Sequence, residues 1–295
     1  MKSTTDVRQT TSEEKEDVNL SQKYDPITGI SEFRKMVLAH YSRHGRLMPW
    51  RDNLGPYSIL VSEIMLQQTQ VERVLTKYPE FLAAFPDFAT LAKAPLADIL
   101  SAWQGMGYNR RAIALQKCAQ RVMNEFNGIL PEDADILATF PGIGCATASS
   151  ICAFAFNQPV VFIETNIRRI FIHFFFPAGA SVTDAEILPL VHTTLYIENP
   201  RVWYWALMDL GSSLKKTVVN PNRRSAHYTK QSAFEGSDRR IRGRIIALLL
   251  KTPALTRAEI AAAFNEDADR IFRIICVLEN EGFIHCMKDR YSLVS

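Results

Sequence analysis

Hydrophobic residues recur at three- and four-residue spacing through residues 30–216, which is the period of amphipathic helices. Leu91, Leu96, Ile99 and Leu100 illustrate this spacing. Proline and glycine interrupt the pattern at frequent intervals, so the sequence predicts many short helices rather than a few long ones. Alternating strand patterns are scarce here. The pattern therefore predicts an all-α body over residues 26–216.

A different pattern follows this body. Residues 217–237 lack periodicity and predict a connector. Beyond it, the spacing predicts helices over 241–250 and 267–280, and Thr256 with Glu259 forms a capping box that opens a helix between them. Two short stretches on either side of Lys288 and Asp289 predict a terminal β-hairpin. Three helices and a hairpin describe a small winged-helix-like α+β domain over residues 238–295.

The composition narrows the class of protein. The chain has 295 residues, of which 47% are hydrophobic and 22% charged, as in ordinary soluble globular proteins. Its most apolar stretch is interrupted by Glu164 and Arg168, well short of the roughly 18 clean residues of a membrane span. Residues 1–25 are polar and aperiodic, which predicts a disordered tail without the apolar core of a signal peptide. We therefore expect a monomeric cytoplasmic protein with no membrane partner.

The positions of the cysteines indicate neither a disulfide network nor a metal site. They are scattered, lie mostly within apolar runs, and include no pair with C-x-x-C spacing. This distribution predicts buried free thiols rather than a disulfide network or a zinc site. The five residues are Cys118, Cys145, Cys152, Cys276 and Cys286.

Positive charge gathers around the connector although the net charge of the chain is only +3. Residues 212–246 hold nine Lys or Arg residues against two acidic ones. A local excess of this kind is expected of a surface that contacts nucleic acid. Arg223 and Arg224 are candidate phosphate contacts within it, and a solvated linker is the alternative interpretation.

A helix–turn–helix pattern surrounds the string PGIG. An amphipathic helix precedes the turn and a second helix begins near Cys145. Gly142 and Gly144 can take positive φ angles and bring backbone N–H groups close to an anion, and the following helix adds its own unpaired amides. Such a hairpin binds a DNA phosphate without reading sequence. The alternative is a turn between helices that binds no ligand.

Two carboxylates lie in strongly apolar surroundings. Glu164 lies within VVFIETNIRRIF, where burial costs several kcal/mol unless the carboxylate is hydrogen-bonded or used in chemistry. Asn166 is a natural hydrogen-bond partner, and a salt bridge to Arg168 is the structural alternative. Glu63 has apolar neighbours on both sides in SILVSEIMLQQTQV, and its alternative is a surface position on an amphipathic helix.

Polar and aromatic residues near these carboxylates suit contact with bases. Gln67, Gln68 and Thr69 follow Glu63 on an otherwise apolar helix and can bond base edges or fill a vacated position in a base stack. The string GMGYNRRA supplies Tyr108 and Arg110, an aromatic side chain beside a cation. This pairing suits stacking on a base together with a phosphate contact.

Residues 48–211 resemble the helix-hairpin-helix (HhH-GPD) DNA glycosylases, most closely the MutY-type adenine DNA glycosylases. The matching strings are MPWR, SEIMLQQTQV, GMGYNRRA, FPGIGCATA and WALMDLG. The resemblance implies the all-α helix-hairpin-helix fold and the excision of adenine mispaired with 8-oxoguanine or guanine in double-stranded DNA. A thymine or uracil mismatch glycosylase on the same scaffold, and a non-catalytic DNA-binding protein, remain as alternatives.

The resemblance also assigns roles by position. Glu63 matches the general acid that protonates the departing adenine, and Asn166 matches the asparagine that supports the family's second acid, at the position of Glu164. Gln68 and Tyr108 match residues that wedge into the duplex. Glu164 falls where the family carries an aspartate that stabilises the cationic sugar. The extra methylene of Glu164 displaces the carboxylate by about 1 Å, which can cost about 100-fold in rate.

Three further features of the chain depart from the family or from its bifunctional relatives. The family's iron–sulfur cysteines follow the DLG string, whereas residues 214–234 here contain no cysteine, so we expect no cluster and no metal cofactor. The hairpin remains a candidate site for a monovalent cation. Ala146 replaces the lysine of bifunctional relatives, which implies a glycosylase without lyase activity. The family's C-terminal domain that checks the opposite 8-oxoguanine is replaced by the winged-helix-like segment.

Overall fold

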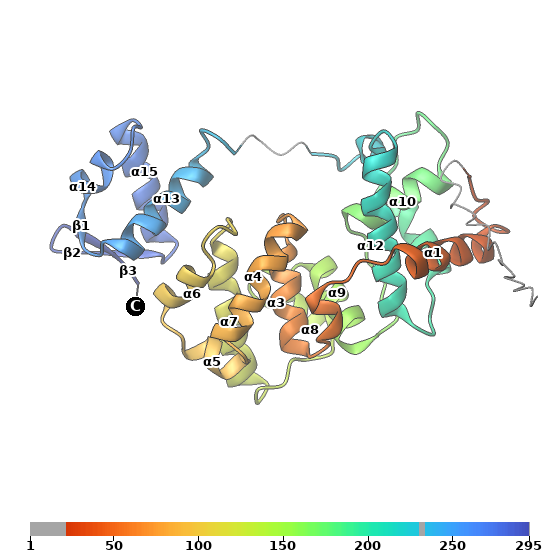
Figure 1. Ribbon diagram of the computed structural model, residues 1–295, viewed down its shortest axis with the longest axis horizontal. Helices are drawn as coiled ribbons and strands as arrows, with labels where there is room; N and C mark the ends of the chain where they lie inside the picture. Colours follow the sequence, from red (N-terminus) through yellow and green to blue (C-terminus); the bar gives the residue numbers. More distant parts are fainter. Residues whose placement is uncertain (1–21, 230–233, 295) are drawn as a thin grey trace, which may run out of the picture.

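The computed structural model describes residues 22–229 and 234–294 (Figure 1). Residues 1–21 of the predicted disordered tail lie outside the described residues. Tyr24 belongs to the same predicted tail, but it is buried against Phe33 and Phe174. Its backbone N–H also donates to the carbonyl of Phe174 at 3.0 Å. The packed body therefore begins two residues before the predicted boundary.

The body is helical throughout, which confirms the predicted fold class. Its helices are short, and polar N-caps begin several of them, as where Asp87 and Asp133 start α5 and α8. In chain order these helices are α1 (Ile30–His44), α2 (Pro49–Asp52), α3 (Pro56–Leu66), α4 (Val71–Ala84), α5 (Phe88–Lys93), α6 (Leu96–Ala102), α7 (Arg110–Glu125), α8 (Ala134–Ala138), α9 (Cys145–Phe156), α10 (Thr165–Phe175), α11 (Asp184–Thr194) and α12 (Pro200–Thr217).

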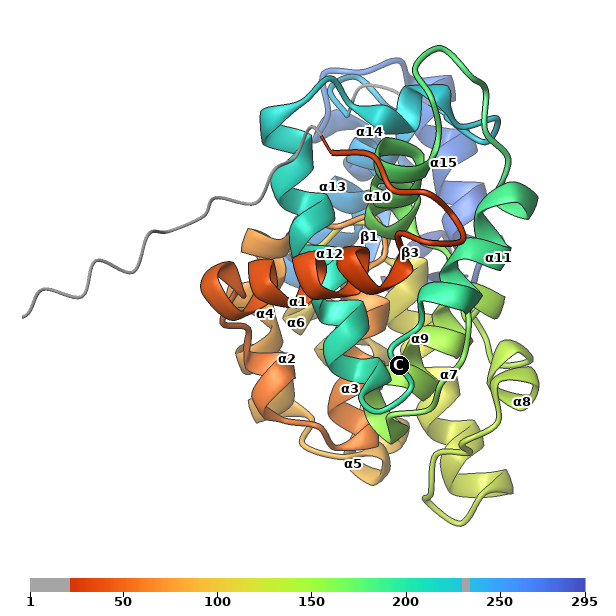
Figure 2. The same ribbon diagram turned by 90° about the vertical axis from the view of Figure 1, so that its right-hand side faces the viewer.

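Two hydrophobic cores divide the body into lobes. One core joins residues of α2 to α9, and the other joins residues of α1 and α10 to α12. Figures 1 and 2 show α3 and α9 at the border between the lobes. In the second core Phe33 meets the fully buried Trp203 edge to face, with 6.0 Å between ring centroids. Each large side chain buried in this way stabilises the fold by about 1.5–3 kcal/mol.

A buried ion network ties the N-terminal part of the first lobe to α12. The Asp209 side chain is only 1% exposed and accepts hydrogen bonds from Arg46 and Arg51. Burial raises the pKa of Asp209, but the hydrogen bonds and charges of the two arginines lower it overall. The MPWR and DLG strings therefore meet in space, where Arg51 and Asp209 form a buried ion pair.

The C-terminal domain is a winged-helix-like unit. Its elements are α13 (Asp238–Lys251), β1 (Leu255–Thr256), α14 (Arg257–Ala262), α15 (Ala268–Asn280), β2 (Ile284–Met287) and β3 (Arg290–Leu293). The predicted capping box between Thr256 and Glu259 is present. Lys288 and Asp289 both take positive φ, as a two-residue hairpin turn requires. The strand order is β1-β3-β2, and β1 was not predicted because two residues are too few to show alternation.

The connector first packs against the body before it crosses to the C-terminal domain. It contains the short helix η1 (Pro221–Arg224), where the Asn222 side chain donates to the carbonyl of Thr165 at 2.9 Å. Val182 and Arg224 are joined by a further backbone hydrogen bond at 2.9 Å. Residues 230–233, which include the basic Lys230, lie outside the described residues. The first part of the connector thus supports the first turn of α10.

The C-terminal domain docks directly on the first lobe. Buried residues of α13, such as Ile241 and Ile245, belong to the same hydrophobic core as Leu100 of α6. Figure 1 shows α13 beside α6, at the far end of the molecule from α1. Among the helices of the described ranges, none is both long enough and apolar enough to cross a membrane.

Candidate active site and DNA-contact surface

Glu63 lies near the end of α3, half-buried, where this helix packs against α9. The hydroxyl of Ser150 on α9 donates to the Glu63 carboxylate at 2.5 Å. The pKa of Glu63 is raised to about 7, mainly because of burial and further because of the charge of Glu164, while the hydrogen bond from Ser150 opposes the shift. A carboxylic acid with this pKa holds a proton at neutral pH and can release it during a reaction. The surface alternative for Glu63 is therefore wrong.

Glu164 is the N-cap residue of α10. Its Oε1 accepts hydrogen bonds from the backbone N–H groups of Asn166 at 2.7 Å and Ile167 at 3.1 Å. Burial raises the pKa of Glu164 overall, although these donors and the charge of Arg169 oppose the shift. The positive end of the helix dipole also favours the ionised form. The sequence alternative was wrong, because Arg168 instead pairs with Asp184 at 2.6 and 2.7 Å.

Asn166 belongs to a short chain of hydrogen bonds that fixes Glu164. Its Nδ2 lies 3.5 Å from Glu164 Oε2, and its Oδ1 accepts from Arg169 Nη1 at 2.7 Å. The same nitrogen of Arg169 donates to the carbonyl of Gly211 at 2.6 Å. A Cβ at Gly211 would lie 2.5 Å from the Asn166 carbonyl oxygen, so only glycine permits this close approach of α12 to α10.

Sequence reasoning missed Ser150, Arg169 and Gly211. The separation between Ser150 and Glu63 is 87 residues, and that between Arg169 and Gly211 is 42, so no local pattern joins these pairs. The DLG string supports the family resemblance, but the sequence assigns no role to its glycine, Gly211. These contacts depend on how α9 packs against α3 and how α12 packs against α10, which the sequence does not show.

The hairpin between α8 and α9 exposes its turn. Gly142 has the predicted positive φ, at 74°, but Gly144 has a φ of −92° and an extended conformation, so that part of the prediction was wrong. Gly144 is the N-cap of α9, a position that any residue with extended backbone can occupy. The exposed start of α9 nevertheless offers backbone N–H groups and a positive dipole end to an anion.

Gln67 joins α3 to this hairpin rather than pointing into solvent. Its Nε2 donates to the carbonyl of Gly142 at 3.1 Å and lies 3.3 Å from Thr147 Oγ1. Thr69 Oγ1 accepts from Arg111 Nη2 at 2.9 Å. Both predicted base-contacting residues therefore also have structural partners within the protein.

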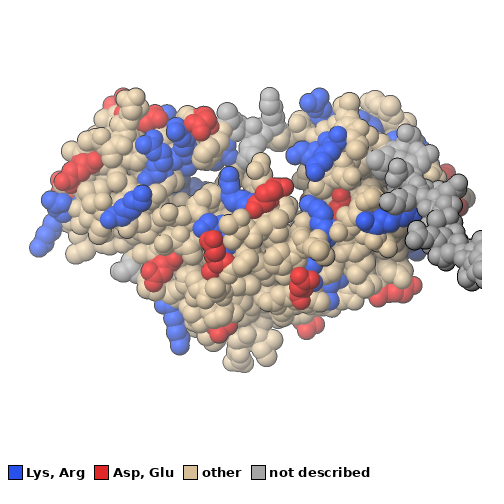
Figure 3. All heavy atoms as spheres, viewed as in Figure 1, with Lys and Arg blue, Asp and Glu red and all other residues tan. Residues whose placement is uncertain are grey.

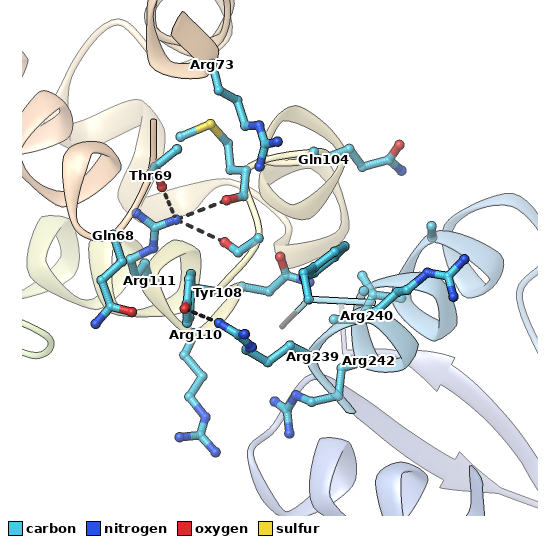
Figure 4. A pocket seen from close by; sticks show the side chains of 18 of the residues that line it. Gln68, Thr69, Arg73, Gln104, Tyr108, Arg110, Arg111, Arg239, Arg240 and Arg242 are labelled. Atoms are coloured by element: carbon cyan, nitrogen blue, oxygen red, sulfur yellow. Dashed lines mark hydrogen bonds between the residues drawn. The ribbon is translucent and has the colours of Figure 1, made fainter. Parts of the chain in front are cut away.

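Gln68 and Tyr108 occupy strained loop positions that face each other across Arg111 (Figure 4). Their φ angles are 54° and 47°, in the left-handed region that non-glycine residues rarely adopt. The buried Arg111 guanidinium holds both loops, since it donates to carbonyls of Ile64, Met65 and Gln67 and to the carbonyl of Gly107. Strain that the surroundings maintain in this way is typical of functional positions.

The predicted phosphate-binding arginines differ in their surroundings. Arg223 is exposed on η1. Arg224 instead donates to the carbonyls of Ala180 at 3.0 Å and of Pro177, so its guanidinium is held within the fold. Arg110 is 72% exposed at the start of α7 and forms an ion pair with Glu281 of the C-terminal domain.

The cysteines do not fit an iron–sulfur cluster. Cys118 and Cys152 are buried and donate to the carbonyls of Pro141 and Glu132. The other cysteines are exposed at Cys145, Cys276 and Cys286, so the prediction that the thiols are buried was wrong for these three. Within the described residues, no group of three or more His, Cys, Asp or Glu side chains could hold a metal ion.

A helical hairpin with an exposed turn, together with two carboxyl groups close enough to influence each other, is the arrangement expected of base-excising DNA glycosylases. The chain belongs to the HhH-GPD superfamily of base excision DNA repair proteins, whose sequence model matches residues 61–188. It is 34% identical over 253 residues to the adenine DNA glycosylase of Mycobacterium tuberculosis (strain H37Rv), covering 78% of this chain and 83% of that protein.

Two further groups of relatives extend this comparison. The adenine DNA glycosylase of Mycolicibacterium smegmatis is 30% identical over 277 residues, which cover 87% of this chain and 94% of that protein. An alignment of this extent includes part of the C-terminal domain. Among solved structures, a thermostable thymine-DNA glycosylase has a TM-score of 0.56 at 24% identity, covering 62% of this chain and 86% of its own. An endonuclease III–DNA complex has a TM-score of 0.51 at 18% identity, with coverages of 61% and 84%. These two structures support the fold alone.

Proposed function

We propose that the protein is a monofunctional DNA glycosylase that hydrolyses the N-glycosidic bond of adenine mispaired with 8-oxoguanine or guanine. The adenine DNA glycosylases among its relatives support adenine as the excised base, and the paired carboxyl groups support hydrolysis of the glycosidic bond. The observation that carries the proposal is the contrast between these groups. Glu63 has a pKa of about 7, whereas Glu164 caps a helix N-terminus and accepts two backbone hydrogen bonds.

Glu63 acts as the general acid. Adenine is a poor leaving group as an anion, so a proton must reach its five-membered ring while the bond to the sugar breaks. The electron pair of that bond stays with adenine, and the base leaves in neutral form. A pKa near 7 keeps a large fraction of Glu63 protonated at neutral pH, and the Ser150 hydroxyl then stabilises the carboxylate that forms.

Glu164 stabilises the positive sugar that remains. Glycosidic cleavage passes through an oxocarbenium-like state, and an ionised carboxylate beside it lowers its free energy. Asn166 and Ile167 hold one carboxylate oxygen against the start of α10, which anchors the longer glutamate side chain where the family carries aspartate. Water then adds to the sugar and loses a proton, which leaves an abasic site.

The remaining site residues bind and open the duplex. The start of α9 with Gly142 and Gly144 would hold a backbone phosphate, and Arg223 would add a contact from the connector. Gln68 and Tyr108 would enter the stack where the adenine has left, because a base inside a duplex cannot reach the carboxyl groups. Arg110, Gln67 and Thr69 line the same cleft as Gln68 and Tyr108, whereas the contacts of Arg224 favour a structural role.

The chain lacks the groups for other chemistry at this site. Ala146 stands at the exposed start of α9 where a lysine would be needed for Schiff-base formation, so the abasic site should remain intact. The cysteine positions give no iron–sulfur ligand set, and no step of the reaction needs one. We propose that the enzyme acts as a monomer, and the monovalent cation at the hairpin stays a prediction.

Replacing Glu63 with Gln tests the acid role directly. The amide keeps the shape of the side chain but cannot donate the acidic proton, so we expect single-turnover excision to fall by about 1,000-fold. DNA affinity, measured by fluorescence anisotropy on the same duplex, should stay within a few-fold. Glu72→Gln on the exposed face of α4 is the matched control and should retain excision. Wild-type turnover in Glu63→Gln would refute the mechanism.

A further inference from the structure

A large cleft lies between the first lobe and the C-terminal domain. Its volume is about 1110 Å³, and neither Glu63 nor Glu164 lines it. The walls are the turn at residues 67–70, the segment 104–111 and one face of α13 (Figure 4). The cleft is therefore a separate feature from the acid site, although Gln68 and Tyr108 border it.

The lining of this cleft is strongly positive. Asp238 is the one acidic residue among the described lining residues, and it pairs with Arg270 at 2.7 Å. Figure 3 shows basic side chains gathered on the C-terminal domain beside its boundary with the body. A concave surface of one charge concentrates the field and attracts a polyanion. The lining arginines are Arg73, Arg110, Arg111, Arg239, Arg240, Arg242 and Arg244.

Contacts across the cleft hold α13 in a fixed position. Glu281, at the end of α15, forms ion pairs with both Arg242 of α13 and Arg110 of the body. Burial raises the pKa of Glu281, but its two arginine partners lower the pKa to about 2, so the carboxylate stays ionised. Arg239 of α13 donates to the hydroxyl of Tyr108 and lies over its ring. These contacts fix the position of the arginine-bearing face of α13 beside Tyr108.

The cleft and the hairpin lie on different sides of α3. In Figure 1, α8 and α9 lie to the right of α3, and α13 lies to its left. If the hairpin holds the strand that carries the target adenine, and Gln68 with Tyr108 enters the stack, the other strand passes on the side of α13. We propose that this cleft binds the phosphodiester backbone of the strand opposite the target base. The proposal rests on the proposed function, since it takes the orientation of the duplex from it.

Two arginines of α13, the half-buried Arg240 and the exposed Arg244, would make these contacts. Arg240 has a surface ion pair with Glu235 at 3.2 Å, which is weak and exchangeable in water. Arg244 is exposed, with its guanidinium 4.6 Å from the ring centre of Phe264. Neither side chain holds the domain to the body, so both can turn towards a phosphate. Each would contribute affinity without reading the opposite base.

The third helix of a winged helix usually enters the DNA groove, but α15 is poorly suited to this role. Its Arg270 is held by Asp238 and by Glu266 at 3.0 Å. Arg273 is exposed, but acidic residues surround it in sequence at Asp269 and Glu279. The first helix therefore replaces the third as the DNA-facing element.

The double variant Arg240→Glu, Arg244→Glu tests the proposal. Binding of a duplex with adenine opposite 8-oxoguanine is measured at several salt concentrations. Two lost phosphate contacts should flatten the slope of log K against log salt by about 2, with binding at least about tenfold weaker. Arg240→Lys, Arg244→Lys keeps both charges and should keep the slope. Arg273→Glu, the same charge change on α15, is the matched control and should bind as wild type.

Three results would overturn the proposal. An unchanged slope in the double glutamate variant would show that α13 makes no phosphate contact. An equal loss of DNA affinity in Arg273→Glu would show that α15 contacts the DNA as much as α13 does. Loss of the preference for mismatched over matched duplexes, at unchanged slope, would mean that the cleft reads base identity. Adenine release by the wild type on the same duplex is scored separately. Its absence would refute the proposed function, whereas the binding slopes alone decide the role of α13.

Discussion

At the scale of single residues, two chemically similar carboxyl groups acquire different properties from their neighbours. Glu63 has one hydroxyl donor and apolar surroundings, which raise its pKa to about 7. Glu164 has two backbone donors and the positive end of α10. These different surroundings suit the two groups to the proposed roles of general acid and stabiliser of the cationic sugar.

Ser150 should set the pH dependence of excision. Its hydroxyl donates to ionised Glu63, so Ser150→Ala removes a stabiliser of the charged form and raises the pKa of Glu63 further. The active form is protonated, so the rate falls as pH rises through this pKa. In Ser150→Ala, the pH at which the single-turnover rate falls on the alkaline side should therefore be higher by about one pH unit. Ser149→Ala, on a different side of α9, should leave this pH unchanged, and a downward shift in Ser150→Ala would contradict this account.

Sequence alone singled out the two carboxyl groups and Asn166, but not Ser150. Glu63 and Glu164 stand out because a carboxylate within an apolar run needs an explanation, and Asn166 was close enough in sequence to be named as a partner. Ser150 could not be found this way, because nothing local distinguishes it from Ser149. Its role depends on how α3 crosses α9, which only the folded chain defines.

At the scale of elements, the site depends on how closely α12 approaches α10. Gly211→Ala would place a Cβ 2.5 Å from the carbonyl oxygen of Asn166, so the first turn of α10 must move. Displacement of Glu164 by about 1 Å should lower excision by about 100-fold. Single-turnover rates and thermal unfolding of the same preparation would separate misplacement from loss of fold. Wild-type rates would show that this contact does not position the carboxylate.

The buried Asp209 network should contribute much more to stability than a surface ion pair. Asp209→Asn leaves the buried Arg51 without its counter-charge, so we expect the free energy of unfolding to fall by about 3 kcal/mol. Glu80→Gln removes the exposed partner of Lys77 and should cost less than about 1 kcal/mol. Chemical denaturation measures both, and similar losses would contradict the structural role of Asp209.

Most elements could be predicted because their signals are local. Helical periodicity predicted the all-α body, and the capping box at Thr256 and the hairpin at Lys288 and Asp289 are present as expected. The conformation of Gly144 was mispredicted because a glycine permits positive φ but does not require it. The strand β1 was not predicted because its two residues form a strand only by pairing with the distant β3.

At the scale of the whole molecule, three units contribute to the proposed site and to the cleft beside it. The first lobe supplies Glu63 and the loops that carry Gln68 and Tyr108, the second supplies Glu164, and the C-terminal domain adds the basic face of α13. The sequence predicted the separate domains and the basic connector between them. The ion pairs of Glu281 that hold α13 against the first lobe join residues 171 and 39 positions apart in the chain, so no local pattern in the sequence points to them.

The most direct test of the account is strand cleavage of a duplex panel that carries A, T or U opposite G or 8-oxoguanine. Each duplex is treated with enzyme and analysed with and without alkali. We predict release of adenine opposite 8-oxoguanine and guanine, with strand breaks only after alkali and no covalent adduct on borohydride treatment. Excision of thymine or uracil instead of adenine, no excision at all, or strand breaks without alkali would contradict the account.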